Sequence, residues 1–259
     1  MPIKEKTALV TGSTGGIGLA FITAFAEAEC NVVFNGFGEQ KTIAEIRALL
    51  EKRGVNVLYH SADVGKPDDI AAMIEAGQAR FGAIDIVVNN AVTRHYAPVE
   101  QFPVDAWDRA LAVNLSAAFH TIRLALPSMK TRGWGRIINM ASIHATNVVR
   151  GRVDYITTKH AIVGLTRAVA LEIAETSVTC NCISPGLVLT PNCERQISAK
   201  VAAGVTREQA ISDMLQIRQP SRRMIMPAEI AQLGVFLCSD AAANINGADL
   251  PIDGAWSTT

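Results

Sequence analysis

The sequence predicts an α/β fold in which one doubly wound parallel sheet carries helices on both faces. Short β-branched runs alternate with longer amphipathic segments along the 259 residues. Runs such as ALV, VVF and IVV are apolar at successive positions, which is typical of parallel strands that are covered on both sides. No linker, low-complexity tract or internal repeat interrupts this alternation. We therefore predict a single Rossmann-like domain over residues 1–259, with about seven strands.

Each segment has a place in that alternation. Strands are expected at 7–11, 31–35, 55–63, 84–90, 136–142, 177–185 and 248–252. Helices are expected at 17–29, 41–53, 67–81, 105–132, 153–174 and 227–239. The stretch 188–224 breaks the alternation, because it is polar with interspersed Met and follows the end of a strand. We predict that it forms a lid over the substrate rather than part of the sheet.

Composition limits the classes of partner. Hydrophobic residues make up 49% of the chain and charged residues 19%, which is enough apolar material for a core. The 24 basic and 24 acidic residues cancel, so no overall field attracts nucleic acid or acidic lipid. No apolar run reaches the roughly 20 residues that span a bilayer, and the N-terminus does not resemble a signal peptide. Five cysteines without paired CxxC spacing predict no metal site and a reduced, cytoplasmic setting.

A glycine cluster, TGSTGGIG at 11–18, follows the first expected strand. A strand that turns directly into a helix can present the helix amides to a pyrophosphate, and side chains in the turn would block that approach. A glycine cluster alone can be no more than a tight turn, but its position at the first strand–helix junction favours a nucleotide site. The expected cofactor residues in this turn are Gly12, Thr14, Gly16, Ile17 and Gly18.

The TGxxxGxG spacing resembles that of the short-chain dehydrogenase/reductase family, and the resemblance extends over nearly the whole chain. Further matches are Asp63 in SADV, Asn90 in NNA, Asn114 in AVNLS, and the Pro185-Gly186 pair. The resemblance implies a dinucleotide site completed by Phe37, Asp63, Val64, Asn90, Ala91, Tyr155, Lys159, Pro185, Gly186, Val188 and Thr190. The second strand ends in NGFGE, and neither this segment nor the glycine turn offers a cation for the extra phosphate of NADP. We therefore expect NAD as the cofactor.

Tyr155 and Lys159 lie four residues apart, so a helix places both on one face. A free tyrosine has a pKa of about 10, and a nearby ammonium favours the phenolate and lowers that value. This pair alone occurs often on ordinary helices. With the glycine turn, Ser142 and Asn114, the family resemblance implies that Tyr155 is the acid–base residue, that Ser142 binds the substrate oxygen, and that Asn114 holds a water connected to Lys159.

Within this family the chain resembles the bacterial D-3-hydroxybutyrate dehydrogenases, through NGFG at 35–38, GRIINMAS at 135–142 and ERQIS at 194–198. That resemblance implies that the residues holding a substrate carboxylate are Arg94, His144, Arg152 and Gln196, beside Ser142 and Tyr155. The expected reaction interconverts a secondary alcohol and a ketone on a small anionic substrate, most like D-3-hydroxybutyrate and acetoacetate.

Several substitutions near the expected substrate leave alternatives open. Arg94 stands where that group has a glutamine, Arg152 where it has a lysine, Val92 where it has a glycine, and Leu187 where it has a tryptophan. A bulkier or more highly charged alcohol is therefore an alternative, such as a cyclic alcohol, a sugar acid or a sulfonate, and the two arginines could instead point to water. A non-catalytic nucleotide sensor is a remote alternative. The family resemblance also implies a homotetramer formed through the helices at 105–132 and 153–174.

Overall fold

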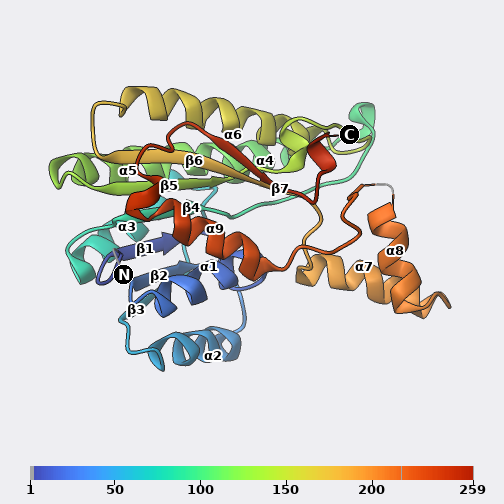
Figure 1. Ribbon diagram of the computed structural model, residues 1–259, viewed down its shortest axis with the longest axis horizontal. Coiled ribbons are helices and arrows are strands. Elements are labelled where there is room, and N and C mark those ends of the chain that lie inside the picture. The colour runs from blue at the N-terminus through green and yellow to red at the C-terminus, as the bar shows by residue number, and fades with distance from the viewer. Residues whose placement is uncertain (1–2, 217, 259) are drawn as a thin grey trace.

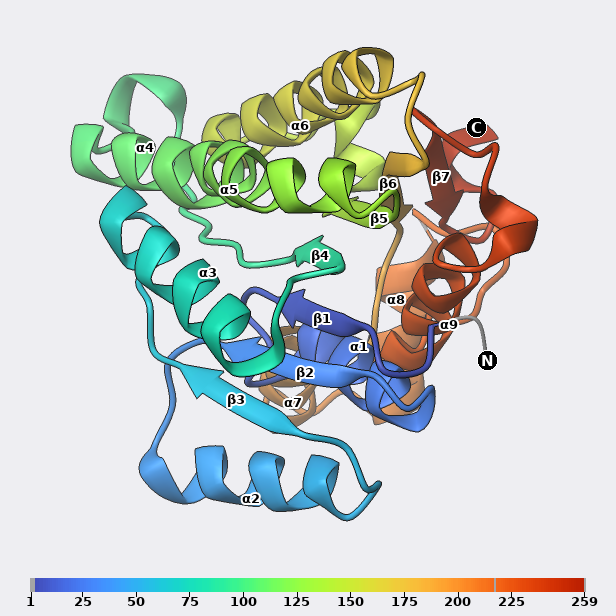
Figure 2. The same ribbon diagram turned by 90° about the vertical axis from the view of Figure 1, so that its left-hand side faces the viewer.

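Seven parallel strands form one sheet in the computed structural model, which describes residues 3–216 and 218–258. The strand order is β3-β2-β1-β4-β5-β6-β7 (Figure 2). The strands are Thr7–Val10 (β1), Asn31–Asn35 (β2), Val57–His60 (β3), Ile86–Asn89 (β4), Gly135–Met140 (β5), Val178–Pro185 (β6) and Asp249–Ile252 (β7). The order reverses between β1 and β4, and the crevice at such a reversal is where this type of sheet binds ligands.

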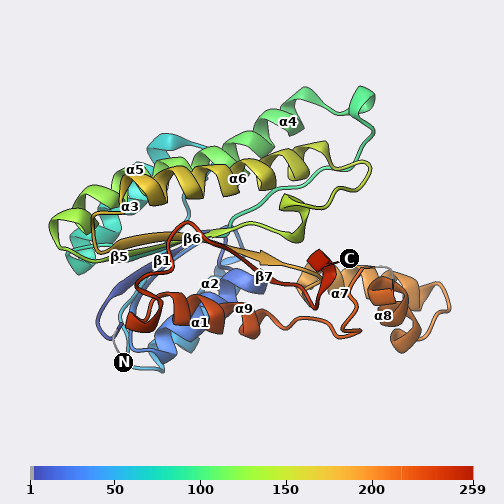
Figure 3. The same cartoon turned by 45° about the horizontal axis from the view of Figure 1, so that its top comes forward.

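Helices cover both faces of the sheet, which confirms the predicted fold class (Figure 1). One layer contains α1 (Gly16–Glu27), α2 (Gln40–Glu51) and α9 (Pro227–Leu237). The other contains α3 (Pro67–Phe81), α4 (Val104–Leu111), α5 (Ala117–Thr131) and α6 (Val153–Glu172), and Figure 3 shows the two layers on opposite sides of the strands. Val32 and Phe34 pack in the first core and Val33 in the second. Successive strand residues therefore face opposite cores, which explains the continuous apolar runs.

The third strand is shorter than the predicted 55–63, since β3 ends at His60. Its neighbour β2 ends at Asn35, so β3 has no backbone partner beyond that register. The side chain of Asn35 takes over: its Nδ2 donates to the carbonyl oxygens of His60 and Ala62, at 3.0 and 2.9 Å. At this end of the sheet, the buried amide of Asn35 therefore makes the hydrogen bonds that a continued strand pairing would otherwise make.

The prediction of one continuous helix at 105–132 is wrong in the middle of that range, where a π-helical turn, η2 (Ala112–Ser116), separates α4 from α5. Asn114 lies in this turn and is buried. Its Oδ1 accepts from the backbone amide of Thr93 at 2.8 Å, and its Nδ2 donates to the carbonyl of Thr93 at 3.0 Å. Such turns are frequent at functional sites, and this one fixes Asn114 against the loop that follows β4.

The stretch 188–224 contains two helices that the sequence analysis did not predict, α7 (Pro191–Ala202) and α8 (Arg207–Gln216). Thr190 begins α7, because its Oγ1 accepts from the amide of Cys193 at 3.3 Å and Pro191 occupies the first turn. The two helices pack on a small core of their own, with Cys193, Ile197, Ala210, Leu215 and Met224. They project beside the carboxyl ends of the strands (Figure 3). Within the described residues, no helix is long and apolar enough to cross a membrane.

Candidate active site

Tyr155 and Lys159 lie on α6 and are both buried. The Nζ of Lys159 lies 5.5 Å from the centre of the Tyr155 ring and donates a hydrogen bond to the carbonyl of Met140, at the end of β5. Ser142 follows that strand, and its hydroxyl is hydrogen-bonded to Tyr155. Helix α6 and strand β5 therefore bring the three predicted side chains together at one point.

The surroundings of Tyr155 make it acidic for a phenol. Burial raises its pKa, but the positive charges of Lys159, Arg94 and Arg152 and the hydrogen bond from Ser142 outweigh that effect and lower the pKa to about 8. Burial also lowers the pKa of Lys159. Tyr155 can therefore release and regain a proton close to neutral pH, as a general acid–base residue must.

Asn114 lies behind this group and is not part of the wall of either cavity described below. Besides its two hydrogen bonds to Thr93, its Nδ2 lies 3.3 Å from the Oγ1 of Thr158, the neighbour of Lys159. The structure thus places Asn114 on the inner side of α6, and a water between it and Lys159 stays a prediction.

A cavity of about 540 Å³ lies along the carboxyl ends of β1, β2 and β4. Its wall includes these predicted cofactor residues: Gly12, Thr14, Gly16, Ile17, Phe37, Asp63, Val64, Asn90, Ala91 and Thr190. A Cβ on Gly12 would lie 2.7 Å from the Cα of Ala91, so only a glycine allows this approach of β1 to the loop after β4. Gly18 lies beneath the turn and is absent from the wall.

Asp63 is engaged by a residue that the sequence analysis missed. The guanidinium of Arg109, on α4, donates to both of its carboxylate oxygens, at 2.9 and 2.7 Å, and holds the pKa of Asp63 below its ordinary value. The two residues are 46 positions apart, so no local sequence pattern signals the pair. Arg109 also forms part of the wall of the larger cavity.

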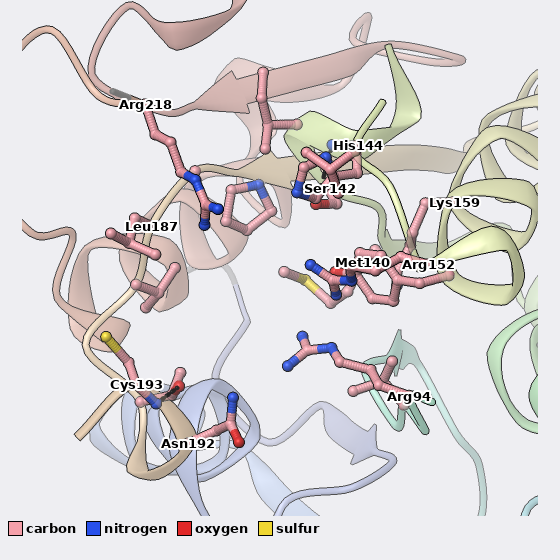
Figure 4. A pocket seen from close by; sticks show the side chains of 18 of the residues that line it. Arg94, Met140, Ser142, His144, Arg152, Lys159, Leu187, Asn192, Cys193 and Arg218 are labelled. Carbon is pink, nitrogen blue, oxygen red and sulfur yellow. Dashed lines mark hydrogen bonds between the residues drawn. The ribbon is translucent and has the colours of Figure 1, made fainter. Parts of the chain in front are cut away.

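A second cavity, of about 340 Å³, has Tyr155 in its wall. Figure 4 shows Arg94, Arg152 and Arg218 around this cavity. All six predicted substrate residues form part of its wall, namely Arg94, Ser142, His144, Arg152, Tyr155 and Gln196. So do Lys159, Pro185, Gly186 and Val188 among the predicted cofactor residues. The guanidinium carbons of Arg152 and Arg94 lie 4.2 and 4.9 Å from the centre of the Tyr155 ring. Both arginines therefore lie over the Tyr155 ring, where their charge acts on its hydroxyl.

The Nε of Arg152 is buried and has no hydrogen-bond partner within the described part of the chain. A buried polar group without a partner is costly, and a ligand that accepts a hydrogen bond would remove that cost. His144 has its own restraint, because its Nδ1 lies 3.0 Å from the carbonyl oxygen of Asn147. A carbonyl only accepts, so Nδ1 carries the proton. Burial lowers the pKa of His144 and keeps the ring neutral.

Other residues of this wall had no signal in the sequence. They come from the loop after β4, the segment before α6, helix α8, the turn after it and the C-terminal segment, and are Tyr96, Arg150, Met214, Arg218 and Trp256. Only tertiary structure brings these segments together. Val92 and Leu187, the positions of two departures from the family pattern, also form part of the wall.

Comparisons with known proteins agree with this geometry. A family model described as Enoyl-(Acyl carrier protein) reductase matches residues 12–257. The chain is similar to a D-beta-hydroxybutyrate dehydrogenase of Rhizobium meliloti, with 46% identity over 97% of this chain and 98% of that one. It is also similar to a D-beta-hydroxybutyrate dehydrogenase of Cupriavidus necator, with 45% identity over 98% of both chains. Among solved structures, it is similar to L-sorbose reductase from Gluconobacter frateurii, in complex with NADPH and L-sorbose, with a TM-score of 0.93, 32% identity, and coverage of 99% and 98% of the two chains. The family match over residues 12–257, the parallel seven-stranded sheet and these relatives together establish that this chain belongs to the short-chain dehydrogenase/reductase family and is an oxidoreductase acting on alcohols and ketones.

Proposed function

We propose that this protein is an NAD(H)-dependent dehydrogenase of a small anionic secondary alcohol, a hydroxy acid most like D-3-hydroxybutyrate, and that it also reduces the corresponding ketone. The observation that carries the proposal is the stacking of two arginines, Arg94 and Arg152, on the ring of a tyrosine that is itself hydrogen-bonded to Ser142. An anionic group bound by these arginines would lie close to the residue that exchanges the proton.

In the oxidation, Ser142 and Tyr155 would hold the substrate hydroxyl and the Tyr155 phenolate would take its proton. The ammonium of Lys159 stabilises that phenolate. Arg152 and Arg94 would bind the carboxylate, and Gln196 would contribute from α7. Lys159, Pro185, Gly186 and Val188, in the wall beside Tyr155, would hold the nicotinamide end of NAD, which would supply the hydride acceptor for the oxidation. In the reduction, the Tyr155 hydroxyl would return the proton to the carbonyl oxygen, which is electrostatically stabilised as charge develops.

The larger cavity fits a dinucleotide, since Gly12, Gly15 and Gly16 in its wall have no side chain to fill it and α1 begins at the cavity wall. Of the described residues in that wall, only Arg94 and Arg109 are cations. Arg109 is held by both oxygens of Asp63, and Arg94 lies over Tyr155. Neither is left for a phosphate near the end of β2, which supports NAD over NADP.

The assembly belongs to the same proposal. Helices α5 and α6 expose apolar side chains on their outer faces, with Phe119 50% and Leu171 80% exposed. We infer a cytoplasmic homotetramer formed through these helices, since exposed apolar surface of this kind is typical of protein interfaces. A dehydrogenase of a bulkier or more highly charged alcohol is the second candidate, because Leu187 and Val92 change the wall of the substrate cavity.

A substrate panel tests the proposed function. We expect NADH formation at 340 nm with D-3-hydroxybutyrate or another short hydroxy acid, and at least roughly tenfold lower kcat/KM with NADP, a difference of about 1.4 kcal/mol. Neutral secondary alcohols of equal length serve as the control. Turnover of the neutral alcohols alone would contradict the anionic part of the proposal, and no turnover of any alcohol with either cofactor would contradict the whole.

The pKa of Tyr155 predicts how activity depends on pH. Because the phenolate is the base, kcat/KM for oxidation should rise with pH and level off above about 8, while reduction should fall above that pH. The charged or polar groups that face this phenol are Lys159, Arg94, Arg152 and Ser142, with neutral His144 beside them. Exchange of Arg94 for Gln removes a cation that lowers the pKa, so the midpoint should move to higher pH. A midpoint near 10 in the unaltered enzyme would contradict this role of the arginines.

Arg152→Ala should raise KM for anionic substrates by roughly 10- to 100-fold, because a hydrogen bond to a charged group contributes about 1.5–3 kcal/mol. Steady-state kinetics over a range of pH measure this effect, because loss of Arg152 also moves the Tyr155 midpoint to higher pH. Arg152→Lys keeps the charge but loses the planar fork of the guanidinium, so KM for anionic substrates should rise less than in Arg152→Ala. A neutral alcohol should show little change in KM with either variant. Equal losses for neutral and anionic substrates would mean that Arg152 supports the tyrosine rather than the carboxylate.

A further inference from the structure

The wall of the substrate cavity carries more positive charge than one carboxylate neutralises. Its cationic residues are Arg94, Arg150, Arg152, Lys159 and Arg218. None of the described residues in that wall is an aspartate or a glutamate. Like charges in a partly enclosed space repel one another, and bound anions relieve that repulsion. The composition of the wall therefore favours a substrate with more than one negative charge.

These cations lie on two sides of the cavity. Arg94 and Arg152 stack on Tyr155, and Lys159 donates to the carbonyl of Met140 beside it. Arg218 lies on the opposite side, where Figure 4 shows its guanidinium pointing into the cavity from the side of Leu187. A single carboxylate bound beside Tyr155 would pair with the first group and leave Arg218 without a counter-charge.

Arg218 is held in this position through its backbone. Its amide donates to the carbonyl of Leu215 at 3.0 Å, at the end of α8. The next residue, Gln219, is buried: its Oε1 accepts from the amide of Leu187 at 2.7 Å, and its Nε2 donates to the carbonyl of Arg223. Gln219 thus ties the start of the 188–224 stretch to its end, which fixes the base of the Arg218 side chain at the cavity.

Two other arginines of the 188–224 stretch have acidic partners. Arg207 pairs with Glu194 at 2.5 Å, and Arg223 pairs with Glu229 at 2.8 Å. Within residues 3–216 and 218–258, no acidic side chain lies within ion-pair distance of Arg218. The guanidinium of Arg218 therefore faces the cavity without a neutralising acidic side chain among the described residues, and a bound anion could neutralise it.

We propose, on the basis of the proposed function, that the substrate is a short hydroxy dicarboxylate. Arg94 and Arg152 bind one carboxylate beside Tyr155, and Arg218 binds the second across the cavity. A planar guanidinium fork matches a carboxylate bidentately, which favours a carboxylate as the second group. The cavity of about 340 Å³ lies near the lower end of the range of roughly 300–1,000 Å³ for small-molecule sites, so the chain between the two charges is short.

The test compares 3-hydroxyglutarate with D-3-hydroxypentanoate, which has the same chain length and lacks the second carboxylate. NADH formation gives kcat and KM for both substrates with the unaltered enzyme and with the Arg218→Gln and Arg218→Lys variants. Arg222→Gln is the matched control, because Arg222 is an exposed arginine four residues away that is absent from the cavity wall. The rise in Tm caused by each substrate analogue in the presence of cofactor measures binding without turnover.

We expect Arg218→Gln to raise KM for the dicarboxylate by roughly 10-fold or more, and to change KM for the monocarboxylate less than about twofold. Arg218→Lys should raise KM for the dicarboxylate less than Arg218→Gln does, and Arg222→Gln should leave KM for both substrates unchanged. The rise in Tm that the dicarboxylate analogue causes should also be smaller in Arg218→Gln than in the unaltered enzyme. Turnover of the monocarboxylate with equal or better kcat/KM than the dicarboxylate, and no selective effect of Arg218→Gln, would overturn this inference and leave the proposed function intact. Absence of turnover with every hydroxy acid would overturn both.

Discussion

Replacement of Tyr155 with Phe should lower kcat by about 10²–10⁴-fold, the contribution typical of a positioned acid–base residue. The variant removes one oxygen and keeps the ring on which Arg94 and Arg152 stack, so the cavity wall and the binding of the anionic group should persist. KM should therefore change much less than kcat. The dependence of oxidation on an ionisation near pH 8 should disappear with the hydroxyl, because that ionisation belongs to Tyr155.

Tyr96→Phe is the matched control. Tyr96 also lies in the cavity wall and also contacts Arg152, whose guanidinium is 5.1 Å from its ring, but it is 60% exposed. Loss of its hydroxyl should leave kcat within about twofold, since surface substitutions away from packing and catalysis have small effects. NAD binding, followed by quenching of tryptophan fluorescence, should be unchanged in both variants. If Tyr155→Phe retained most of its turnover, a different residue would have to donate the proton. If the unaltered enzyme turned over no substrate at all, the remote alternative of a non-catalytic nucleotide sensor would be favoured instead.

The fold and the central group could be predicted because their signals are local. Strand residues such as Val32, Val33 and Phe34 face two cores in succession, so their apolar run reports a sheet buried on both sides. Tyr155 and Lys159 lie one helical turn apart, and the glycine turn follows a strand directly. In each case the residues that act together are close in the sequence, and their spacing follows from helix or strand geometry.

The remainder of the site depends on tertiary contacts that no sequence period encodes. Arg109 reaches Asp63 across 46 positions, and Arg218 reaches the cavity only because α7 and α8 fold back towards β6. The π turn at Ala112–Ser116 was missed for the same reason, since the partner of Asn114 is the backbone of Thr93 in a distant loop. The helices α7 and α8 have short, mostly polar sequences that bury only a few residues each, so their apolar periodicity is weak.

Gly18→Ala should be the most damaging single-methyl change in the cofactor site. Gly18 lies in the first turn of α1, where a Cβ would sit 2.4 Å from the carbonyl oxygen of Gly12, 2.6 Å from the Nδ2 of Asn90 and 2.7 Å from the Cα of Ser13. Two of these atoms are backbone, and Asn90 is held by hydrogen bonds from its Nδ2 to the carbonyls of Thr11 and Gly12. None can move without opening the turn.

Overpacking of this kind costs about 3 kcal/mol. For a chain of this size that cost should lower Tm by roughly 6–12 °C in the absence of cofactor. The same displacement moves the amides that face the dinucleotide, so NAD affinity should fall by about 10-fold or more, measured by fluorescence titration of the folded variant below its Tm.

Gly15→Ala is the control that distinguishes the steric clash at Gly18 from the loss of a glycine in the turn. Gly15 belongs to the same turn, but its φ of −177° is extended backbone that any residue adopts, and a Cβ there meets no atom within 4 Å. Its Tm without cofactor should stay within a degree or so of the unaltered protein, because surface substitutions of this kind change stability by less than about 0.5 kcal/mol. Equal losses of Tm in Gly15→Ala and Gly18→Ala would show that backbone freedom, rather than close packing of α1 on β1, is what this turn requires. A loss confined to Gly18→Ala would assign the requirement to the contact between Gly18 and Gly12, and would explain why a residue outside the cavity wall controls the cofactor site.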